Sequence, residues 1–193
     1  MTVVDDAYKF VFKGQLTDAA LDRAGRKRRH DLSFDAEALR KTLGVDILDT
    51  EFVASAERMS LVYVTVAAFE NSARELVTRV LLEAEGEDWW DNCVSERIRT
   101  DAKKRMEAEQ QVRWHVQRGG SPIKFTMLPN LANIIANNID KFEAYLPDIE
   151  WVKSVFEVVE RSRNVIMHSG VLSDRDMARL GSLIRDWNSQ VSI

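Results

Sequence analysis

Cysteine is almost missing from the chain, since Cys93 is the only one among 193 residues. A single thiol forms no disulfide within the chain and cannot supply a zinc site built from several cysteines. This usage favours a reducing compartment, so we expect a cytoplasmic protein. The histidines His30, His115 and His168 are scattered and form no HExxH-type pair, which disfavours a metal hydrolase. We therefore expect no metal ion and no cofactor.

Proline and glycine are also scarce, with three and eight residues, and most of them fall between periodic apolar segments. No alternating pattern typical of a strand stands out, so the sequence predicts an all-α protein. Long apolar runs are missing too, because no run approaches the roughly 20 residues that a membrane span needs. The first residues show no basic stretch followed by an apolar core. We therefore expect neither a signal peptide nor a membrane anchor.

The sequence predicts long helices that glycine and proline separate. Their apolar residues recur at three-four spacing, and the segments run from Thr50 to Glu85, over 87–118, from Thr126 to Pro147, from Asp148 to Gly170 and from Ser173 to Val191. The first of them carries one apolar stripe that includes Phe52, Met59 and Tyr63. We divide the chain into an N-terminal extension, residues 1–45, and a helical domain, residues 46–193. Within the extension, Asp35 is expected to cap a short helix that Gly44 ends.

The net charge is −4, but basic residues gather in two places. One is residues 23–30, and the other is residues 97–124, which carry eight basic residues against three acidic ones. Either stretch is a phosphate-binding surface or the solvated face of a helix. In the second stretch we take Lys103, Lys104 and Arg105 as candidate nucleic-acid contacts.

One element of the sequence proposes a chemistry, namely Arg163 and Asn164 followed by His168 near the end of a predicted helix. Arginine holds phosphate, and histidine moves protons near neutral pH, so the two suffice to cut RNA without a metal. Asn164 and His168 share one helix face. Arg163 lies about 140° away from His168 on an ideal helix, so either its long side chain wraps back or its catalytic partner comes from elsewhere. A second subunit is the natural source of such a partner.

Spacing alone is a weak signal, because Arg23 and His30 meet it too within an aperiodic basic stretch. A purely structural alternative also exists for residues 161–170. In it, Arg163 pairs with Glu160 or Glu157 on the same helix, and the imidazole complements the helix end.

The chain resembles the HEPN superfamily (higher eukaryote and prokaryote nucleotide-binding domains) over roughly residues 55–191. The hallmark of that family is an arginine, often followed by a polar residue, and then a histidine after four to six intervening residues. Arg163-Asn164…His168 fits the shortest spacing, and Phe69-Glu70…Arg74 is similar to an early helix of the family. Further patches are similar to a branch seen with PIN-type nucleases and as free-standing bacterial proteins: Trp89-Trp90, Leu131…Ile135 and Ser173-Asp174.

This resemblance implies an up-down helical bundle with long antiparallel helices that forms a homodimer. It also implies a metal-independent endoribonuclease, in the role of a toxin or phage-defence effector, with an antitoxin or regulatory protein as a partner. His168 would assist attack of the ribose 2′-hydroxyl, Arg163 would stabilise the phosphoryl charge, and Asn164 would orient the groups. Glu70 and Arg74 would form a supporting network around Arg163. The products would carry a 2′,3′-cyclic phosphate and a 5′-hydroxyl.

Two other functions are open to a sequence of this kind. Many members of the family only bind RNA or protein, so the chain could be a non-catalytic binding module. A helical dimerisation protein that uses the Trp89-Trp90 patch as its interface is the third reading. Cleavage of RNA that depends on His168 separates the first function from the other two.

Overall fold

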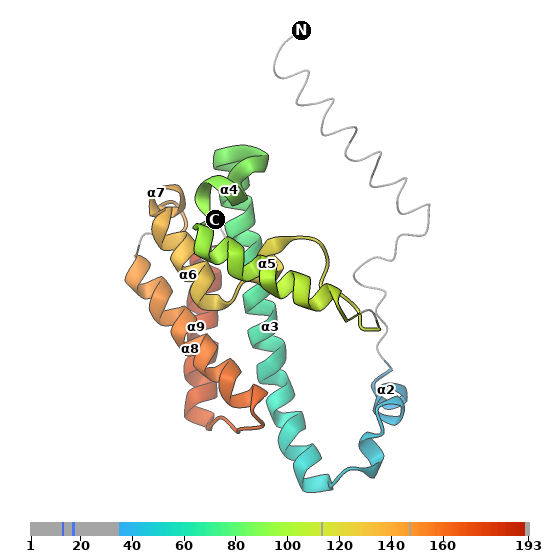
Figure 1. The fold of residues 1–193 in the computed structure, drawn as a ribbon. Coiled ribbons are helices and arrows are strands. Elements are labelled where there is room, and N and C mark those ends of the chain that lie inside the picture. The colour runs from blue at the N-terminus through green and yellow to red at the C-terminus, as the bar shows by residue number, and fades with distance from the viewer. Residues whose placement is uncertain (1–12, 14–16, 18–34, 113, 147, 192–193) are drawn as a thin grey trace. The chain divides into compact units, whose positions relative to one another are not determined.

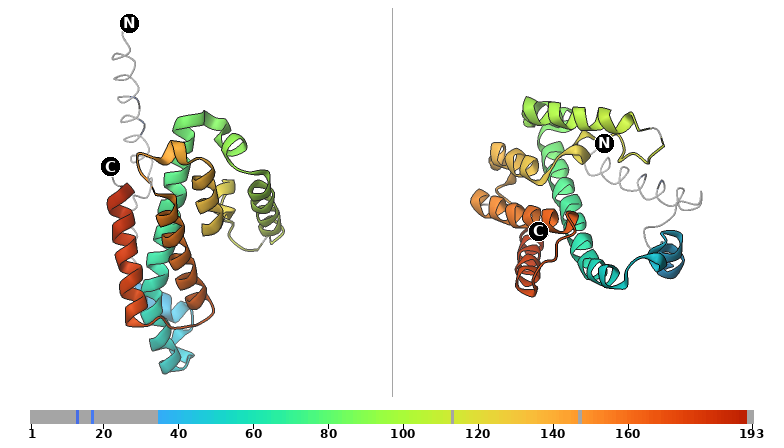
Figure 2. Two further views of the ribbon diagram at one scale, coloured as in Figure 1. Left: turned by 90° about the vertical axis from the view of Figure 1, so that its left-hand side faces the viewer. Right: turned by 60° about the horizontal axis from the view of Figure 1, so that its bottom comes forward.

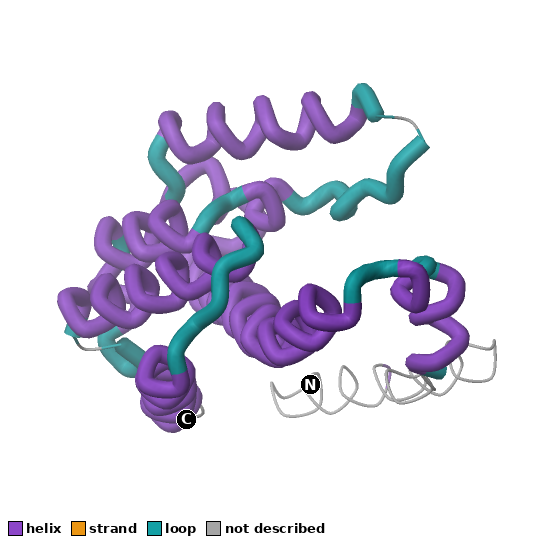
Figure 3. The backbone as a smooth tube through the Cα atoms, turned by 90° about the horizontal axis from the view of Figure 1, so that it is seen from below, coloured by secondary structure: helices purple, strands orange, loops and turns teal. Residues whose placement is uncertain are grey.

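The computed structural model describes residues 13, 17, 35–112, 114–146 and 148–191. The chain divides into two units, Met1–Asp49 and Thr50–Ile193. Most of the predicted extension, including Arg23 and His30, lies outside the described residues. Every regular element among the described residues is a helix, as Figure 3 shows. The all-α prediction is therefore confirmed.

The first unit contains the helix α2 (Ala36–Thr42) and a 3-10 turn, η2 (Val45–Ile47). The Asp35 carboxylate accepts a hydrogen bond from the Ala38 amide at 3.0 Å, so it caps α2 as predicted. Gly44 follows the helix with a φ of 65°, a left-handed conformation that glycine adopts without steric cost.

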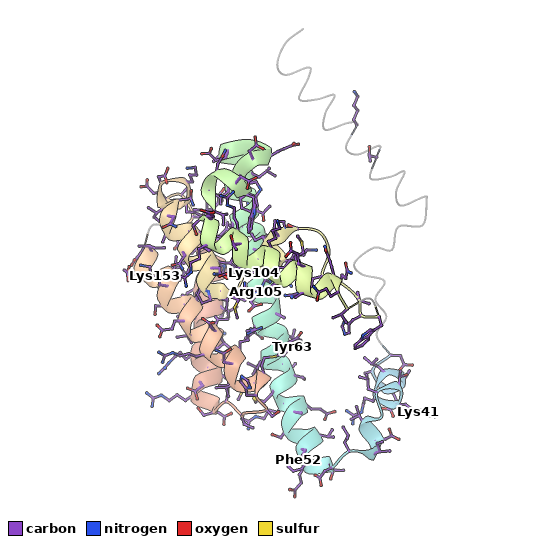
Figure 4. The ribbon with its side chains drawn as sticks, in the orientation of Figure 1. Lys41, Phe52, Tyr63, Lys104, Arg105 and Lys153 are labelled. Carbon is purple, nitrogen blue, oxygen red and sulfur yellow. The ribbon has the colours of Figure 1, made fainter. Side chains whose placement is uncertain are left out.

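The longest element is α3 (Thr50–Glu85), which runs along the second unit and has the predicted bounds (Figure 1). Its apolar stripe is buried only in part. Met59 and Val66 lie in the core, but the side chains of Phe52 and Tyr63 are 77% and 55% exposed (Figure 4). The N-terminal half of α3 therefore presents apolar side chains to solvent, because no other described helix of its unit covers them.

The rest of the second unit consists of shorter helices: η3 (Gly86–Asp88), α4 (Trp89–Cys93), α5 (Glu96–Gln110), η4 (Pro122–Phe125), α6 (Leu128–Asn137), α7 (Ile139–Phe142), α8 (Ile149–Met167) and α9 (Asp174–Val191). Two predicted helices are thus broken, one between α4 and α5 and the other between α6 and α7. The amide of Asn138 donates to the carbonyls of Cys93 and Ile134 at 3.0 and 2.8 Å. This buried side chain satisfies carbonyl groups near the ends of α4 and α6, which stabilises both breaks.

The helices α3, α8 and α9 lie side by side, with α8 antiparallel to the other two (Figures 1 and 2). Their contact is aromatic: the ring centroids of Phe69 (α3), Phe156 (α8) and Trp187 (α9) lie 5.2 to 5.5 Å apart. Such a cluster buries a large apolar area and fixes the three helices against one another. Asp148 caps α8 as predicted, since its carboxylate accepts from the amides of Glu150 and Trp151.

One helical stretch in the described part of the chain, Thr50–Cys93, is long and apolar enough to cross a membrane by length and composition alone. The expectation that no stretch approaches that length was therefore too strict. A single stretch of this kind is weak grounds for a membrane span, because the core helix of a soluble protein passes the same test. Within that stretch the apolar segment is 22% buried in the structure, and farther along α3 Ala73 and Val77 lie in the core.

Candidate functional site

A pocket of about 420 Å³ opens where α3, α5, η4 and α8 meet in the second unit. Five cationic side chains and two carboxylates line it, so the pocket is positively charged in a chain whose net charge is −4. The lining consists of Glu70, Asn71, Arg74, Arg105, Arg118, Lys124, Phe125, Thr126, Met127, Leu128, Glu160 and Arg163.

Glu70 lies between two of these arginines. Its Oε2 atom is 3.3 Å from Nη2 of Arg74, one turn along α3, and its Oε1 atom is 3.3 Å from Nε of Arg163 on α8. The side chains of Glu70 and Arg74 are each 16% exposed, so solvent screens this network less than it screens a surface ion pair. The structure thus brings together the three residues Glu70, Arg74 and Arg163.

The same contacts rule out the pairing of Arg163 within its own helix. Glu157 pairs instead with Arg161, and no ion pair joins Glu160 to Arg163 among the described residues. The guanidinium of Arg163 makes no hydrogen bond to a described residue, so its terminal nitrogens stay free to bind a ligand.

Two arginines from different helices hold one wall of the pocket. Arg74 donates to the carbonyl of Thr126 at 3.1 Å, and Arg105 donates to the carbonyl of Phe125 at 2.9 Å. Of the three candidate nucleic-acid contacts on α5, only Arg105 lines the pocket, and it does so as a structural clamp. Lys103 and Lys104 are exposed outside the pocket, and Figure 4 labels Lys104 beside Arg105.

Arg118 and Lys124 complete the basic lining, and the selection of candidate contacts from the sequence missed both. Arg118 donates to the Glu109 carboxylate through its backbone amide and through Nε, the latter at 2.6 Å, and its guanidinium lies 4.5 Å from the Phe125 ring centroid. The backbone and side-chain hydrogen bonds of Arg118 lower the pKa of Glu109. Lys124 is exposed, and its ammonium group has no hydrogen bond or ion pair with any residue that the structure describes.

His168 and Asn164 lie elsewhere, on the exposed C-terminal end of α8. His168 is the C-cap residue, and neither side chain lines the pocket. The structure therefore separates these two predicted site residues from the group formed by Glu70, Arg74 and Arg163. No histidine is among the residues that line the pocket.

The turn after His168 has a defined geometry. The amide of Ser169 donates to the carbonyl of Ile166 at 3.1 Å, and the amide of Gly170 donates to the carbonyl of Val165 at 2.8 Å. This is the Schellman pattern, with Ser169 at the left-handed position and a φ of 60°. A Cβ atom on Gly170 would lie 2.7 Å from Cγ1 of Val165. Gly170 is thus required for a close approach, whereas Ser169 adopts the conformation that glycine usually takes.

Trp89 is 8% exposed and packs edge-on against Trp90, so it belongs to the core rather than to a surface patch. Among the described residues, no three or more His, Cys, Asp or Glu side chains gather as they would around a metal ion.

Comparisons of the chain with protein-family models, curated proteins and solved structures found no match.

Proposed function

We propose that the protein is a metal-independent endoribonuclease of the HEPN type, whose active site is assembled from Arg163 and His168 at the interface of a homodimer. One observation supports this most. Arg163 is directed to a positively charged pocket by Glu70, but no histidine lines that pocket, and His168 is exposed on the same helix. A second copy of the chain is able to supply the imidazole that the pocket lacks.

The chemistry follows from the two side chains. The imidazole of His168 accepts the proton of a ribose 2′-hydroxyl as its oxygen attacks the adjacent phosphorus. The guanidinium of Arg163 stabilises the negative charge that develops on the phosphoryl oxygens. The bond from phosphorus to the 5′-oxygen then breaks, and that oxygen takes up a proton. Asn164 orients the reacting groups, and the products carry a 2′,3′-cyclic phosphate and a 5′-hydroxyl.

The surface around His168 supports a homodimer. Met167 and Val171 beside it are 55% and 54% exposed, and Leu61 and Val64 on α3 are 71% and 60% exposed. The amide of Leu172 lies 3.3 Å from the sulfur of Met59, so the turn after α8 contacts this part of α3. Exposed apolar side chains on both elements are typical of a protein interface.

RNA cleavage in the presence of EDTA tests the proposal. The wild-type chain should cleave single-stranded RNA, and His168→Ala and Arg163→Ala should each lose at least about a hundred-fold in rate with the fold intact by circular dichroism. Lys153→Gln, a change on the exposed surface of α8, serves as the control and should leave the rate unchanged. Robust cleavage by both alanine variants would remove the two residues from the mechanism.

A non-catalytic RNA- or protein-binding module is the second candidate, and the positive charge of the pocket favours it over a plain dimerisation protein. It predicts binding of RNA without cleavage and little dependence on His168. The biological role that we propose for the active enzyme is that of a cytoplasmic toxin or phage-defence effector, held in check by an antitoxin or regulatory protein.

A further inference from the structure

We propose that the pocket binds a phosphate of single-stranded RNA through Lys124 and Arg163, and that Trp114 stacks on a neighbouring base. The inference rests on the proposed function only for the identity of the ligand. Nothing in the reaction itself requires Lys124 or Trp114, so the two residues are binding residues, separate from the catalytic pair.

Charge identifies the class of ligand. Glu70 neutralises Arg74 and holds Nε of Arg163, while the ammonium group of Lys124 has no counter-charge among the described residues. Glu160 is the other carboxylate at the pocket, and it does not pair with a described cation. The cations outnumber the carboxylates, and those that lack a hydrogen bond come from two elements, η4 and α8. An anion with several acceptor oxygens, such as a phosphate, suits this arrangement.

The segment that joins α5 to η4 identifies a second contact. Its described residues are 111–112 and 114–121, and they lie between the end of α5 and the start of η4 (Figure 3). Its base is fixed at the wall of the pocket, because Arg118 binds Glu109 of α5 and stacks on Phe125 of η4. Beyond this base, Trp114 is 86% exposed and Val116 is 87% exposed. Because the base of the segment is anchored and the indole of Trp114 is exposed, the ring is suited to stacking on a base of a bound strand.

The cations of the pocket and the exposed ring of Trp114 together favour a nucleic-acid strand as the ligand. Proteins that bind single strands combine cations along the backbone with aromatic rings on which bases stack. Arg118 links the two features in this chain, because its backbone belongs to the Trp114 segment and its guanidinium lines the pocket. A partner that offered only negative charge would make no use of the exposed ring.

The test measures binding of a labelled 2′-O-methyl oligonucleotide, which lacks the 2′-hydroxyl and so stays intact on the wild-type protein. In EDTA, Lys124→Gln should weaken binding and reduce the slope of log Kd against log salt concentration by about 0.7, the loss expected for one phosphate contact. Trp114→Ala should weaken binding about ten-fold without a change in that slope. Lys153→Gln, the matched lysine control, should change neither quantity.

Two further probes distinguish a nucleic-acid strand from phosphate alone and from a free nucleotide. Inorganic polyphosphate carries phosphates without bases, so its affinity should respond to Lys124→Gln but not to Trp114→Ala. Adenosine monophosphate should compete poorly, and displacement of the strand at stoichiometric concentrations would make a free nucleotide the ligand and overturn the proposal. Both side chains are exposed, so these variants should keep the fold, which circular dichroism checks.

The proposal fails if Trp114→Ala binds the strand as tightly as the wild type, or if Lys124→Gln keeps the wild-type salt slope. These outcomes are distinct from a failure of the proposed function. Cleavage without any effect of Lys124 or Trp114 would overturn only this inference. Binding with the predicted dependence, but without cleavage of natural RNA, would overturn only the nuclease.

Discussion

The Glu70 carboxylate joins α3 to α8 through the guanidinium of Arg163, with 3.3 Å between Oε1 and Nε. The second oxygen of Glu70 faces Arg74, so one negative charge separates two positive ones. The orientation of Arg163 toward the pocket therefore depends on a residue of another helix rather than on its own.

Replacing Glu70 with glutamine should destabilise the fold by about 1–3 kcal/mol, because two partly buried arginines would face each other without a counter-charge. Urea unfolding measures the change. Glu157→Gln removes the exposed ion pair with Arg161 and should cost less than about 1 kcal/mol. Equal losses in the two variants would show that the Glu70 network is no stronger than a surface pair.

Ser169→Gly should stabilise the protein by roughly 0.5–1 kcal/mol. A left-handed conformation costs an L-residue about 1–2 kcal/mol, and the greater freedom of glycine in the unfolded chain offsets part of that gain. Ser169→Ala keeps a Cβ atom at this position and should give no such gain. A shift of the urea midpoint reports both variants, and a loss of stability in Ser169→Gly would contradict the strain at this residue.

Acidification should release the anchor between Glu109 and Arg118. The pKa of Glu109 is lowered in the folded protein, so its contribution to stability is present above the unfolded-state pKa and is lost as the pH falls through the folded-state value. Wild type should therefore be more stable than Glu109→Gln near neutral pH, and the difference should vanish in acid. Urea midpoints of both proteins over this range provide the measurement, and a constant difference would exclude the linkage.

Mixing two inactive variants tests the shared active site. In a dimer of one Arg163→Ala chain and one His168→Ala chain, one of the two composite sites keeps both residues. After random exchange of subunits the mixture should regain about a quarter of the wild-type rate in EDTA. A mixture that stays inactive would place the two residues in one chain, because every chain then carries a defect.

A charge within the exposed apolar surface should disrupt the proposed dimer. Val64→Glu places a carboxylate on α3 where the side chain is 60% exposed, so the single chain has room for it. The variant should run as a monomer in sedimentation experiments and lose cleavage, because a buried unpaired charge disfavours association. Glu75→Gln, an exposed change farther along α3, is the control and should leave the oligomeric state unchanged.

Local signals in the sequence were sufficient for α3 and α8. Asp148 and Gly86 mark a start and a stop, and α3 and α8 lie close to the predicted bounds. The break after α6 was not predictable, because the Asn138 amide binds the carbonyl of Cys93, a residue far away in the sequence. An apolar stripe likewise does not reveal which element covers it. The spacing of Tyr63 is that of a core residue, but its side chain is exposed in the structure.

The candidate site was predictable only in its composition. Arg163 was selected from the Arg-Asn…His pattern, and Glu70 and Arg74 were selected from a resemblance. The structure places all three residues in one network. The basic stretch at 97–124 contains Arg118 and Lys124, but periodicity cannot show that they converge with Arg163 on one pocket. That convergence depends on the packing of α5 and η4 against α3, which is a tertiary property.

The tryptophans differ in exposure, so their intrinsic fluorescence reports on one part of the chain. Trp89 and Trp187 are buried, Trp90 and Trp151 are half-buried, and Trp114 alone is bare. The red edge of the emission spectrum and the fraction quenched by iodide should therefore come mainly from the segment between α5 and η4. Emission at the red edge of the spectrum would therefore report changes around Trp114 in the unlabelled protein, with little contribution from the buried tryptophans.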